Sequence, residues 1–153
     1  TEIAPRWSPD GERIVFMGSA LWNDISRYEI YIMDADGDNF EQLTDNDSAD
    51  RYPSWSPDGE RIIFHSMRDG DYDLYTMSPD GSEVEQLTDN DRNDVYGMYS
   101  PNGAFIVFSA YSGDEVDDLY VMVANPNSAL LIHLICRSSA QCGHPIARCW
   151  LTT

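Results

Sequence analysis

The sequence predicts an all-β fold made of four-stranded antiparallel blades, and three observations support this. The stretch 52–64 indicates a strand, a tight turn and a second strand, and it recurs at residues 5–16 and, in altered form, at 97–108. Trp7 and Trp55 are 48 residues apart, and Trp55 and Tyr99 are 44 residues apart. Repeats of roughly 40–50 residues with four strands each are typical of β-propellers.

The turn inside each repeat has a defined chemistry. In the second repeat, Pro57 presets φ at the second turn position, Asp58 is tolerated at the third, and Gly59 supplies the left-handed residue that lets the next strand begin. Trp55 before the turn and Phe64 after it supply apolar side chains to the two strands. This combination predicts a hairpin at the start of every blade.

The second repeat contains all four expected strands. We expect them near residues 52–56, 61–66, 73–77 and 83–88. The first repeat matches with strands at 29–33 and 40–44, and the third matches as far as 118–122. The expected blades are about 3–48, 49–92 and 93–135, so that residues 1–122 hold the three repeats and the apolar run 129–135 adds an outer strand.

These motifs resemble the TolB-like propeller repeat, a relative of the WD repeat. The second repeat carries nearly every element of that pattern: Trp55-Ser56-Pro57-Asp58-Gly59, Ile62, Phe64, Arg68-Asp69-Gly70, Leu74-Tyr75, Met77, Asp80-Gly81 and Leu87-Thr88. The resemblance covers about residues 3–122. It implies a propeller of the six-bladed TolB type and a periplasmic or secreted location. The TolB docking role itself is not carried over, and our first functional hypothesis is a non-catalytic scaffold that binds a protein or peptide. Prolyl-oligopeptidase-type hydrolases carry similar repeats, so an accessory propeller of such an enzyme is the alternative.

Charge restricts the classes of partner. The chain of 153 residues has a formal net charge of −18, and all nine basic residues are arginine. Nucleic acid and anionic membrane surfaces both need basic groups, so we expect neither as a partner. A cationic protein or peptide, or a divalent cation, suits this composition. No apolar run long enough to span a membrane and no signal-peptide pattern at the N-terminus are found in the sequence.

Two nearly identical acidic loops follow the fourth strands, at residues 44–50 and 88–94. In an up-and-down meander these loops share one end of the blades with the loops between the second and third strands. We therefore predict a partner-binding acidic face made of Asp45, Asp47, Asp50, Asp69, Asp71, Asp89, Asp91, Asp94 and Trp22. The six aspartates of the two loops are also a calcium candidate, since Ca²⁺ takes six to eight oxygen ligands. The other reading is that these aspartates cap turns.

No catalytic motif is present. The sequence lacks a nucleophile elbow, a phosphate-binding glycine loop and a zinc-protease motif, and its three histidines are isolated. We therefore expect no enzyme activity and no cofactor apart from the calcium alternative. His65 is expected to be a packed or solvated residue.

The expected core of the repeats comprises Trp7, Phe16, Tyr31, Trp55, Phe64, Tyr75, Tyr99, Phe108 and Tyr120. Three blades form an arc with two open flanks, whereas propellers usually close with roughly four to eight blades. We expect Trp7, Phe16 and Tyr31 at one flank. We expect Tyr99, Phe108 and Tyr120 at the other. A homodimer that closes a six-bladed ring would cover both flanks.

The C-terminal part departs from the repeat. Residues 119–153 contain no acidic side chain, and residues 136–153 form a tail that matches no blade. Cys136, Cys142 and Cys149 do not match a known zinc spacing, so one disulfide with a free thiol, or three free thiols, is expected. Whether this tail is a native extension or a shifted reading frame stays open.

Overall fold

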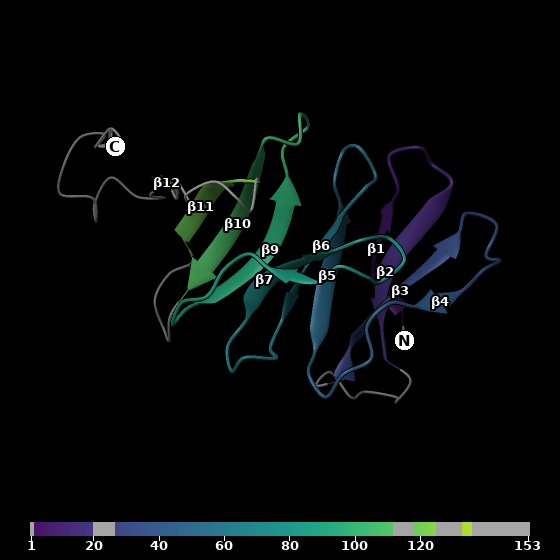
Figure 1. Ribbon diagram of the computed structural model, residues 1–153, viewed down its shortest axis with the longest axis horizontal. Coiled ribbons are helices and arrows are strands. Elements are labelled where there is room, and N and C mark those ends of the chain that lie inside the picture. The colour runs from purple at the N-terminus through teal and green to yellow at the C-terminus, as the bar shows by residue number, and fades with distance from the viewer. Residues whose placement is uncertain (1, 20–26, 112–117, 125–132, 136–153) are drawn as a thin grey trace.

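The structure is a computed structural model that describes residues 2–19, 27–111, 118–124 and 133–135. These residues form three four-stranded antiparallel sheets that lie side by side (Figure 1). The first blade contains β1 (Glu2–Trp7), β2 (Arg13–Gly18), β3 (Glu29–Asp34) and β4 (Glu41–Gln42). The second contains β5 (Asp50–Trp55), β6 (Ile62–Ser66), β7 (Asp73–Met77) and β8 (Glu85–Gln86). The third contains β9 (Asn93–Tyr99), β10 (Phe105–Tyr111), β11 (Asp118–Val123) and β12 (His133–Ile135).

The hairpin turn between the first two strands of each blade confirms the predicted chemistry. Gly59 has a φ of 75°, and Gly11 and Gly103 have φ values of 76° and 71°. The Asp58 carboxylate accepts hydrogen bonds from the Ser56 hydroxyl and, at 3.1 Å, from the backbone N–H of Glu60. The amide oxygen of Asn102 accepts the equivalent hydrogen bonds in the third blade. A side-chain acceptor and the left-handed glycine together fix the turn before each second strand.

The outer strands β4 and β8 are shorter than the predicted strands at 40–44 and 83–88. The backbone N–H of Ile30 donates to Thr44 Oγ1 at 2.9 Å, and the N–H of Leu74 donates to Thr88 Oγ1 at 2.9 Å. A threonine side chain thus satisfies a donor that the backbone of a longer outer strand would have bonded. β12 falls within the predicted outer strand 129–135, of which residues 129–132 lie outside the described part of the chain.

Each blade packs on its neighbours through two different faces. One core cluster joins Val15 and Ile30 of the first blade to Trp55, Phe64 and other residues of the second. Another joins Ile63 and Leu74 of the second blade to the third, through Ile106, Phe108, Ala110 and Met122. We call the side with the Trp55 and Phe64 positions the aromatic face, and the side with the Ile63 and Leu74 positions the aliphatic face. The aromatic face of a blade therefore meets the aliphatic face of the preceding blade.

This arrangement corrects one expectation about the open flanks. Tyr99, Phe108 and Tyr120 do not lie on an open flank, because they belong to the aromatic face that packs against the second blade. Side chains alternate along a strand, so equivalent repeat residues point to the same side in every blade. The other side of the third blade carries the half-buried Val107 and Val121 instead.

The aromatic face of the first blade is the opposite flank, as expected. Trp7, one of the expected core residues, is 61% exposed because the described residues include no preceding blade to cover it. Phe16 is only 3% exposed, since rings of its own blade pack around it. Its centroid lies 5.8 Å from that of Tyr31 and 5.8 Å from that of Phe40.

Glycines allow close approach where consecutive blades meet. A Cβ added at Gly103 would lie 3.4 Å from Pro57 Cγ, and one at Gly59 would lie 3.7 Å from Pro9 Cδ. At Gly11 of the first blade no atom lies within 4 Å of such a Cβ. The tightest site is Gly97, where a Cβ would lie only 2.7 Å from Ile63 Cδ1. A larger side chain at Gly97 would therefore displace Ile63 and Leu74 from their present positions.

Replacing Gly97 with valine is expected to lower the free energy of unfolding by roughly 1–3 kcal/mol, because the added methyl groups overpack the interface between the second and third blades. Chemical denaturation followed by circular dichroism measures this change. Ala104→Val, at an exposed turn of the same blade, is the matched control and should change stability little. Equal stability of the Gly97 variant and the control would contradict the tight interface.

Candidate functional site: the acidic loop end of the blades

The two acidic loops have the same internal hydrogen bonds. Asn46 donates from Nδ2 to Asp50 Oδ2 at 2.7 Å, and its Oδ1 accepts the backbone N–H of Ser48 at 2.8 Å. Asn90 repeats both contacts, with Asp94 Oδ2 at 2.7 Å and the N–H of Arg92 at 3.1 Å. The central asparagine therefore shapes each loop, and the near identity of the two sequences reflects this shared geometry.

The structure separates the predicted acidic face into exposed and buried members. Asp50 and Asp94 are only 0% and 1% exposed, so they do not belong to the exposed part of the predicted face, and Asp94 instead lines a pocket described below. Asp71 is half-buried, and Trp22 lies outside the described residues. The exposed members are Asp45, Asp47, Asp69, Asp89 and Asp91.

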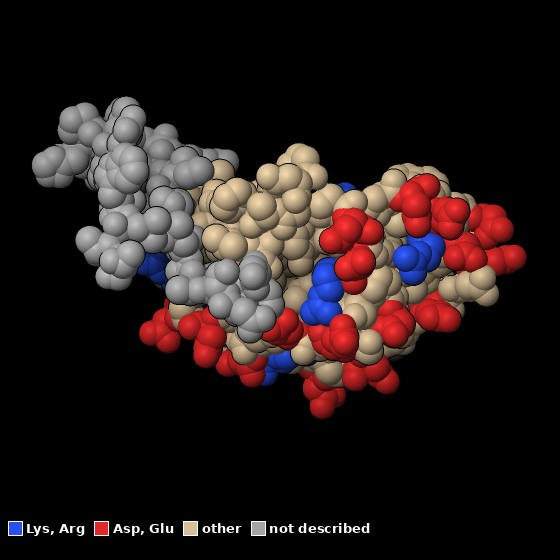
Figure 2. Space-filling view, turned by 45° about the horizontal axis from the view of Figure 1, so that its top comes forward, with Lys and Arg blue, Asp and Glu red and all other residues tan. Residues whose placement is uncertain are grey.

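Acidic side chains are not confined to this end of the blades. The turns at the opposite end carry Asp10, Asp58 and Asp80, each of which accepts hydrogen bonds within its own turn. Figure 2 shows acidic side chains along two borders of the visible surface, with few basic ones between them. The loop end is thus one of two acidic regions, and the acids of the opposite end include several that serve turn structure.

Asp50 is held by Arg68, which belongs to the Arg68-Asp69-Gly70 element of the repeat pattern. Arg68 Nη2 lies 3.2 Å from Asp50 Oδ1 and 3.1 Å from Oδ2. The guanidinium carbon lies 4.5 Å from the ring centroid of Tyr75 and 5.6 Å from that of Phe64. The ion pair therefore compensates the buried carboxylate, while the rings cover the cation. Only the spatial register of the blade, absent from the sequence pattern, brings these groups together.

Two further acids lie behind the loops, at the start of each third strand. Thr44 Oγ1 donates to Glu29 Oε2 at 2.6 Å, and Thr88 Oγ1 donates to Asp73 Oδ1 at 3.1 Å. Burial raises the pKa of Glu29 to about 7, against the opposing effect of hydrogen bonds from Thr44 and Asn46. Burial likewise raises the pKa of Asp73 to about 6. Both carboxyl groups consequently take up protons close to neutral pH.

An open pocket of about 360 Å³ lies between the second acidic loop and the third blade. It is lined by Thr88, Asp89, Asn90, Arg92, Asp94, Phe108, Ala110 and Tyr120. Arg92 stands at its side and donates a hydrogen bond from Nη1 to the Tyr120 hydroxyl. Burial raises the pKa of Asp94, while hydrogen bonds from Asn90 and Thr88 and the charge of Arg92 act against this shift. The pocket thus combines a buried carboxylate with aromatic walls.

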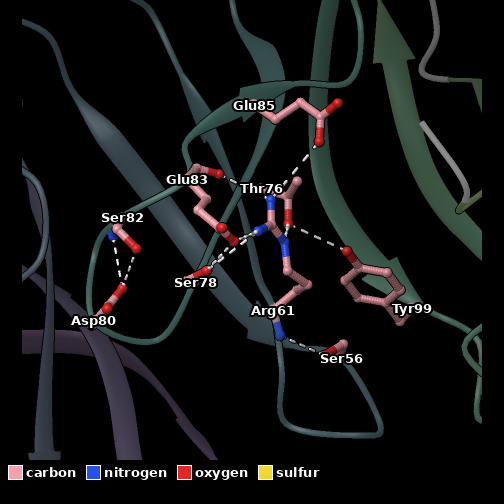
Figure 3. A network of polar contacts seen from close by, with 9 residues as sticks. All are labelled: Ser56, Arg61, Thr76, Ser78, Asp80, Ser82, Glu83, Glu85 and Tyr99. Atoms are coloured by element: carbon pink, nitrogen blue, oxygen red, sulfur yellow. Dashed lines mark hydrogen bonds and ion pairs between the residues drawn. The ribbon is translucent and has the colours of Figure 1, made fainter. Parts of the chain in front are cut away.

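A polar network at the opposite end of the second blade connects it to the third (Figure 3). Arg61 Nη1 lies 3.1 Å from Glu83 Oε2, and its Nε donates to Thr76 Oγ1 at 3.3 Å. The Thr76 hydroxyl lies 3.3 Å from the hydroxyl of Tyr99 in the third blade. Most contacts of this network lie within the second blade, and the Thr76–Tyr99 pair links that blade to the third.

An aromatic cluster lines the inner strands. Tyr52 and Tyr96 have positive φ values of 50° and 58°, at equivalent bulges of β5 and β9. The backbone N–H of Tyr96 donates to His65 Nδ1 at 3.3 Å. Burial, with a smaller effect from Arg51, lowers the pKa of His65 to about 3. His65 is therefore a neutral packed residue that holds a strained backbone in place.

Two observations bear on metals and membranes. Within residues 2–19, 27–111, 118–124 and 133–135, no three carboxylate, histidine or cysteine side chains converge as a metal-binding group. That part of the chain also contains no helix with the length and apolar character needed to cross a membrane.

The three sheets, their shared turn chemistry and their face-to-face packing define a β-propeller repeat protein. Residues 1–137 match the family described as the TolB beta propeller domain. The chain therefore belongs to this family, which confirms the resemblance seen in the repeats. A comparison with curated proteins finds no match.

Solved structures show the same similarity. A TolB-like protein of Agrobacterium tumefaciens is 28% identical with a TM-score of 0.75, covering 86% of this chain and 48% of the other. TolB from Acinetobacter baumannii is 27% identical with a TM-score of 0.69, covering 86% of this chain and 31% of the other. Puromycin hydrolase shares the fold, with 20% identity and a TM-score of 0.69. The alignment covers 86% of this chain and 22% of the enzyme. The chain thus spans about half, or less, of the length of these proteins.

The buried carboxyls predict how stability depends on pH. Because Glu29 has a folded-state pKa of about 7 against an ordinary value of 4.5, the folded state binds its proton more tightly than the unfolded state. The free energy of unfolding should therefore decrease as pH rises from about 4.5 to about 7. Thermal melts from pH 4 to 8 measure this decrease, and Glu29→Gln should make it less steep.

The control for this measurement is Glu60→Gln, which removes the same charge from an exposed position of the second blade. It should keep the steep dependence of the parent chain apart from a small general effect of net charge. Identical slopes for the Glu29 and Glu60 variants would rule out Glu29 as the source.

Proposed function

We propose that this chain is a non-catalytic propeller scaffold that binds a cationic protein or peptide through its acidic loop end. The observation that carries the proposal is the set of exposed aspartates on the loop end, which comprises Asp45, Asp47, Asp69, Asp89 and Asp91. A net charge of −18 without any lysine favours a partner of opposite charge. A periplasmic location belongs to the same proposal, in keeping with membership of the TolB propeller family.

The scaffold is further proposed to assemble as a homodimer that closes a six-bladed ring. In the second blade, Trp55 packs on the first: its Nε1 donates to the Arg6 carbonyl at 3.3 Å, and Arg13 lies 5.0 Å from its ring. Trp7 is the equivalent residue of the first blade and is exposed. The aliphatic face of the third blade, with Val107 and Val121, is the kind of surface that an aromatic face meets elsewhere in the chain.

Two copies related by a two-fold axis would join these unlike faces twice. Each contact would repeat the geometry already present between the first and second blades, with apolar burial worth about 25 cal/mol per Å². The same pairing of an aromatic face with an aliphatic face already occurs twice within the chain.

A second candidate function is the propeller portion of a prolyl-oligopeptidase-type hydrolase. Its support is the fold shared with puromycin hydrolase. An active-site serine probe applied to the purified chain distinguishes the two functions. Covalent labelling with peptide hydrolysis would overturn the non-catalytic proposal, and the absence of labelling is the expected result.

Light scattering on the purified chain is expected to give the mass of a dimer, 34.6 kDa for two chains of 17.3 kDa. Trp7→Glu should shift the mass toward the monomer, because it places a charge in the aromatic face of the first blade. Met67→Glu, at an exposed loop position away from both flanks, is the matched control and should leave the dimer intact. A monomeric parent chain at micromolar concentration, or a trimer or tetramer, would contradict the proposed ring.

A lysine hexapeptide is expected to bind the acidic loop end at low ionic strength. The variant with Asp45, Asp47, Asp89 and Asp91 all changed to asparagine should bind it several-fold more weakly, since four charges are removed from one end. A control with Glu2, Glu12, Glu41 and Glu60 changed to glutamine loses the same number of charges at other exposed positions. Titration calorimetry measures both, and equal weakening in the two variants would refute a localised binding face.

The aspartates of the two acidic loops carry like charges and repel one another. We therefore predict that added NaCl raises the melting temperature of the parent chain, because salt screens this repulsion. No response to NaCl or CaCl₂ would contradict the proposed cation-sensitive face. A response to CaCl₂ far above that at matched ionic strength would show a specific calcium site, with the six loop aspartates as its candidate ligands.

A further inference from the structure

The second blade shows which group fits the space beside its buried aspartate. The guanidinium of Arg68 occupies that space and contacts four residues of the same blade. It pairs with Asp50, its Nε donates to Ser66 Oγ at 2.9 Å, and it lies over the rings of Phe64 and Tyr75. A planar cation is thus enclosed by a carboxylate, a hydroxyl and two aromatic faces.

The third blade repeats this arrangement around an open pocket. Asp94 pairs in register with Ala110, as Asp50 pairs with Ser66 in the second blade. Phe108 and Tyr120 stack with centroids 5.5 Å apart and an interplanar angle of 21°, and the equivalent rings of the second blade stack at 5.9 Å and 28°. All four equivalents of the residues around Arg68 line the 360 Å³ pocket.

The residue equivalent to Arg68 differs in the sequence of the third repeat. Aligning the second strands of the two repeats places Ser112 at the position of Arg68. Ser112 lies outside the described residues, but its side chain has no cationic group to supply. The pocket therefore keeps the carboxylate and the two rings that surround Arg68, with Ala110 in place of the Ser66 hydroxyl, while the chain's own arginine at that position is replaced.

Arg92 is the cation next to this pocket, and it takes a different position. Its guanidinium carbon lies 5.9 Å from the Tyr120 centroid, against 4.5 Å between Arg68 and Tyr75. It bonds to the Tyr120 hydroxyl, at the outer edge of the ring. Arg92 thus forms a wall of the pocket, and the aromatic faces below it border the cavity.

We propose that this pocket binds the guanidinium group of an arginine side chain from a partner protein or peptide. The bound guanidinium would pair with the Asp94 carboxylate and stack on Tyr120 and Phe108, as Arg68 does at the equivalent position. The proposal rests on the proposed function, because it assigns one specific contact to the cationic partner of the acidic loop end. Arginine suits the site better than lysine, since a planar fork pairs with a carboxylate and stacks on rings at the same time.

Titration calorimetry with three short peptides tests this proposal. The peptides are acetyl-Gly-Arg-Gly-amide and the versions with lysine or citrulline in place of arginine. We expect the arginine peptide to bind several-fold more tightly than the lysine peptide, because the ammonium group cannot make the paired contact. The citrulline peptide, which keeps the planar shape without the charge, should bind weakest.

Variants of the pocket complete the experiment. Asp94→Asn should abolish the preference for arginine, whereas Asp91→Asn, an exposed change in the same loop with the same loss of charge, should retain it. Ser112→Arg places an arginine at the position equivalent to Arg68, so it should block the arginine peptide without lowering the melting temperature. This second variant decides the question even if the Asp94 variant fails to fold.

The outcomes separate the pocket from the acidic face. Equal binding of the arginine and lysine peptides, with the same affinity in the Asp94 and Asp91 variants, would overturn the pocket and leave a general acidic attraction intact. Failure of the arginine peptide to bind would also overturn the pocket, while the lysine hexapeptide decides the acidic face separately. Loss of binding in Arg92→Ser would show that Arg92, rather than the aromatic and carboxylate walls, makes the contact, and would equally overturn the proposal.

Discussion

The packing of an aromatic face on an aliphatic face between consecutive blades is the interaction on which the rest of the structure depends. Both buried hydrophobic clusters of the described residues contain side chains from two blades. The arrangement is directional, since the two sides of a blade differ. It therefore fixes the order and the orientation of the blades together.

The acidic loop end follows from this packing. Each acidic loop is the covalent link between the last strand of one blade and the first strand of the next, so the docking of blades determines where its buried aspartate lies. Asp50 meets Arg68 only because the first strand of the second blade pairs with the strand that precedes Arg68. The exposed aspartates project from a loop whose base is held by Asn46 or Asn90.

Much of the fold could be predicted from local chemistry. The Ser-Pro-Asp-Gly turn of the first two repeats, and its Ser-Pro-Asn-Gly counterpart in the third, predicted the hairpins, and their spacing predicted the number of blades. The side chains that face each adjacent blade could not be assigned in the same way. Alternation along a strand shows only that consecutive side chains point to opposite sides of the sheet, and it does not show which side meets which blade. For this reason Tyr99, Phe108 and Tyr120 were expected at a flank that Val107 and Val121 occupy.

The candidate site shows the same limit. The duplicated loops were visible in the sequence, but Asp50 and Asp94 have the same residue type as their exposed neighbours and differ only in burial. The contacts of Arg68 join residues up to 18 positions apart, so the repeat pattern that contains Arg68 does not show that it pairs with Asp50. The burial of Asp50 and Asp94 and the contacts of Arg68 both depend on how strands far apart in the sequence pair with one another. The sequence pattern does not specify this pairing residue by residue.

The most direct test of the central claim is the coupling between Leu74 on the aliphatic face of the second blade and Phe108 on the aromatic face of the third. A double-mutant cycle with Leu74→Ala and Phe108→Ala, measured by chemical denaturation, should give a coupling free energy of roughly 0.5–3 kcal/mol, because both side chains belong to one buried cluster. Val15 of the first blade belongs to a different cluster and is the control partner for Phe108. A coupling between Leu74 and Phe108 no larger than that of the control pair would contradict the account of how the blades are held together.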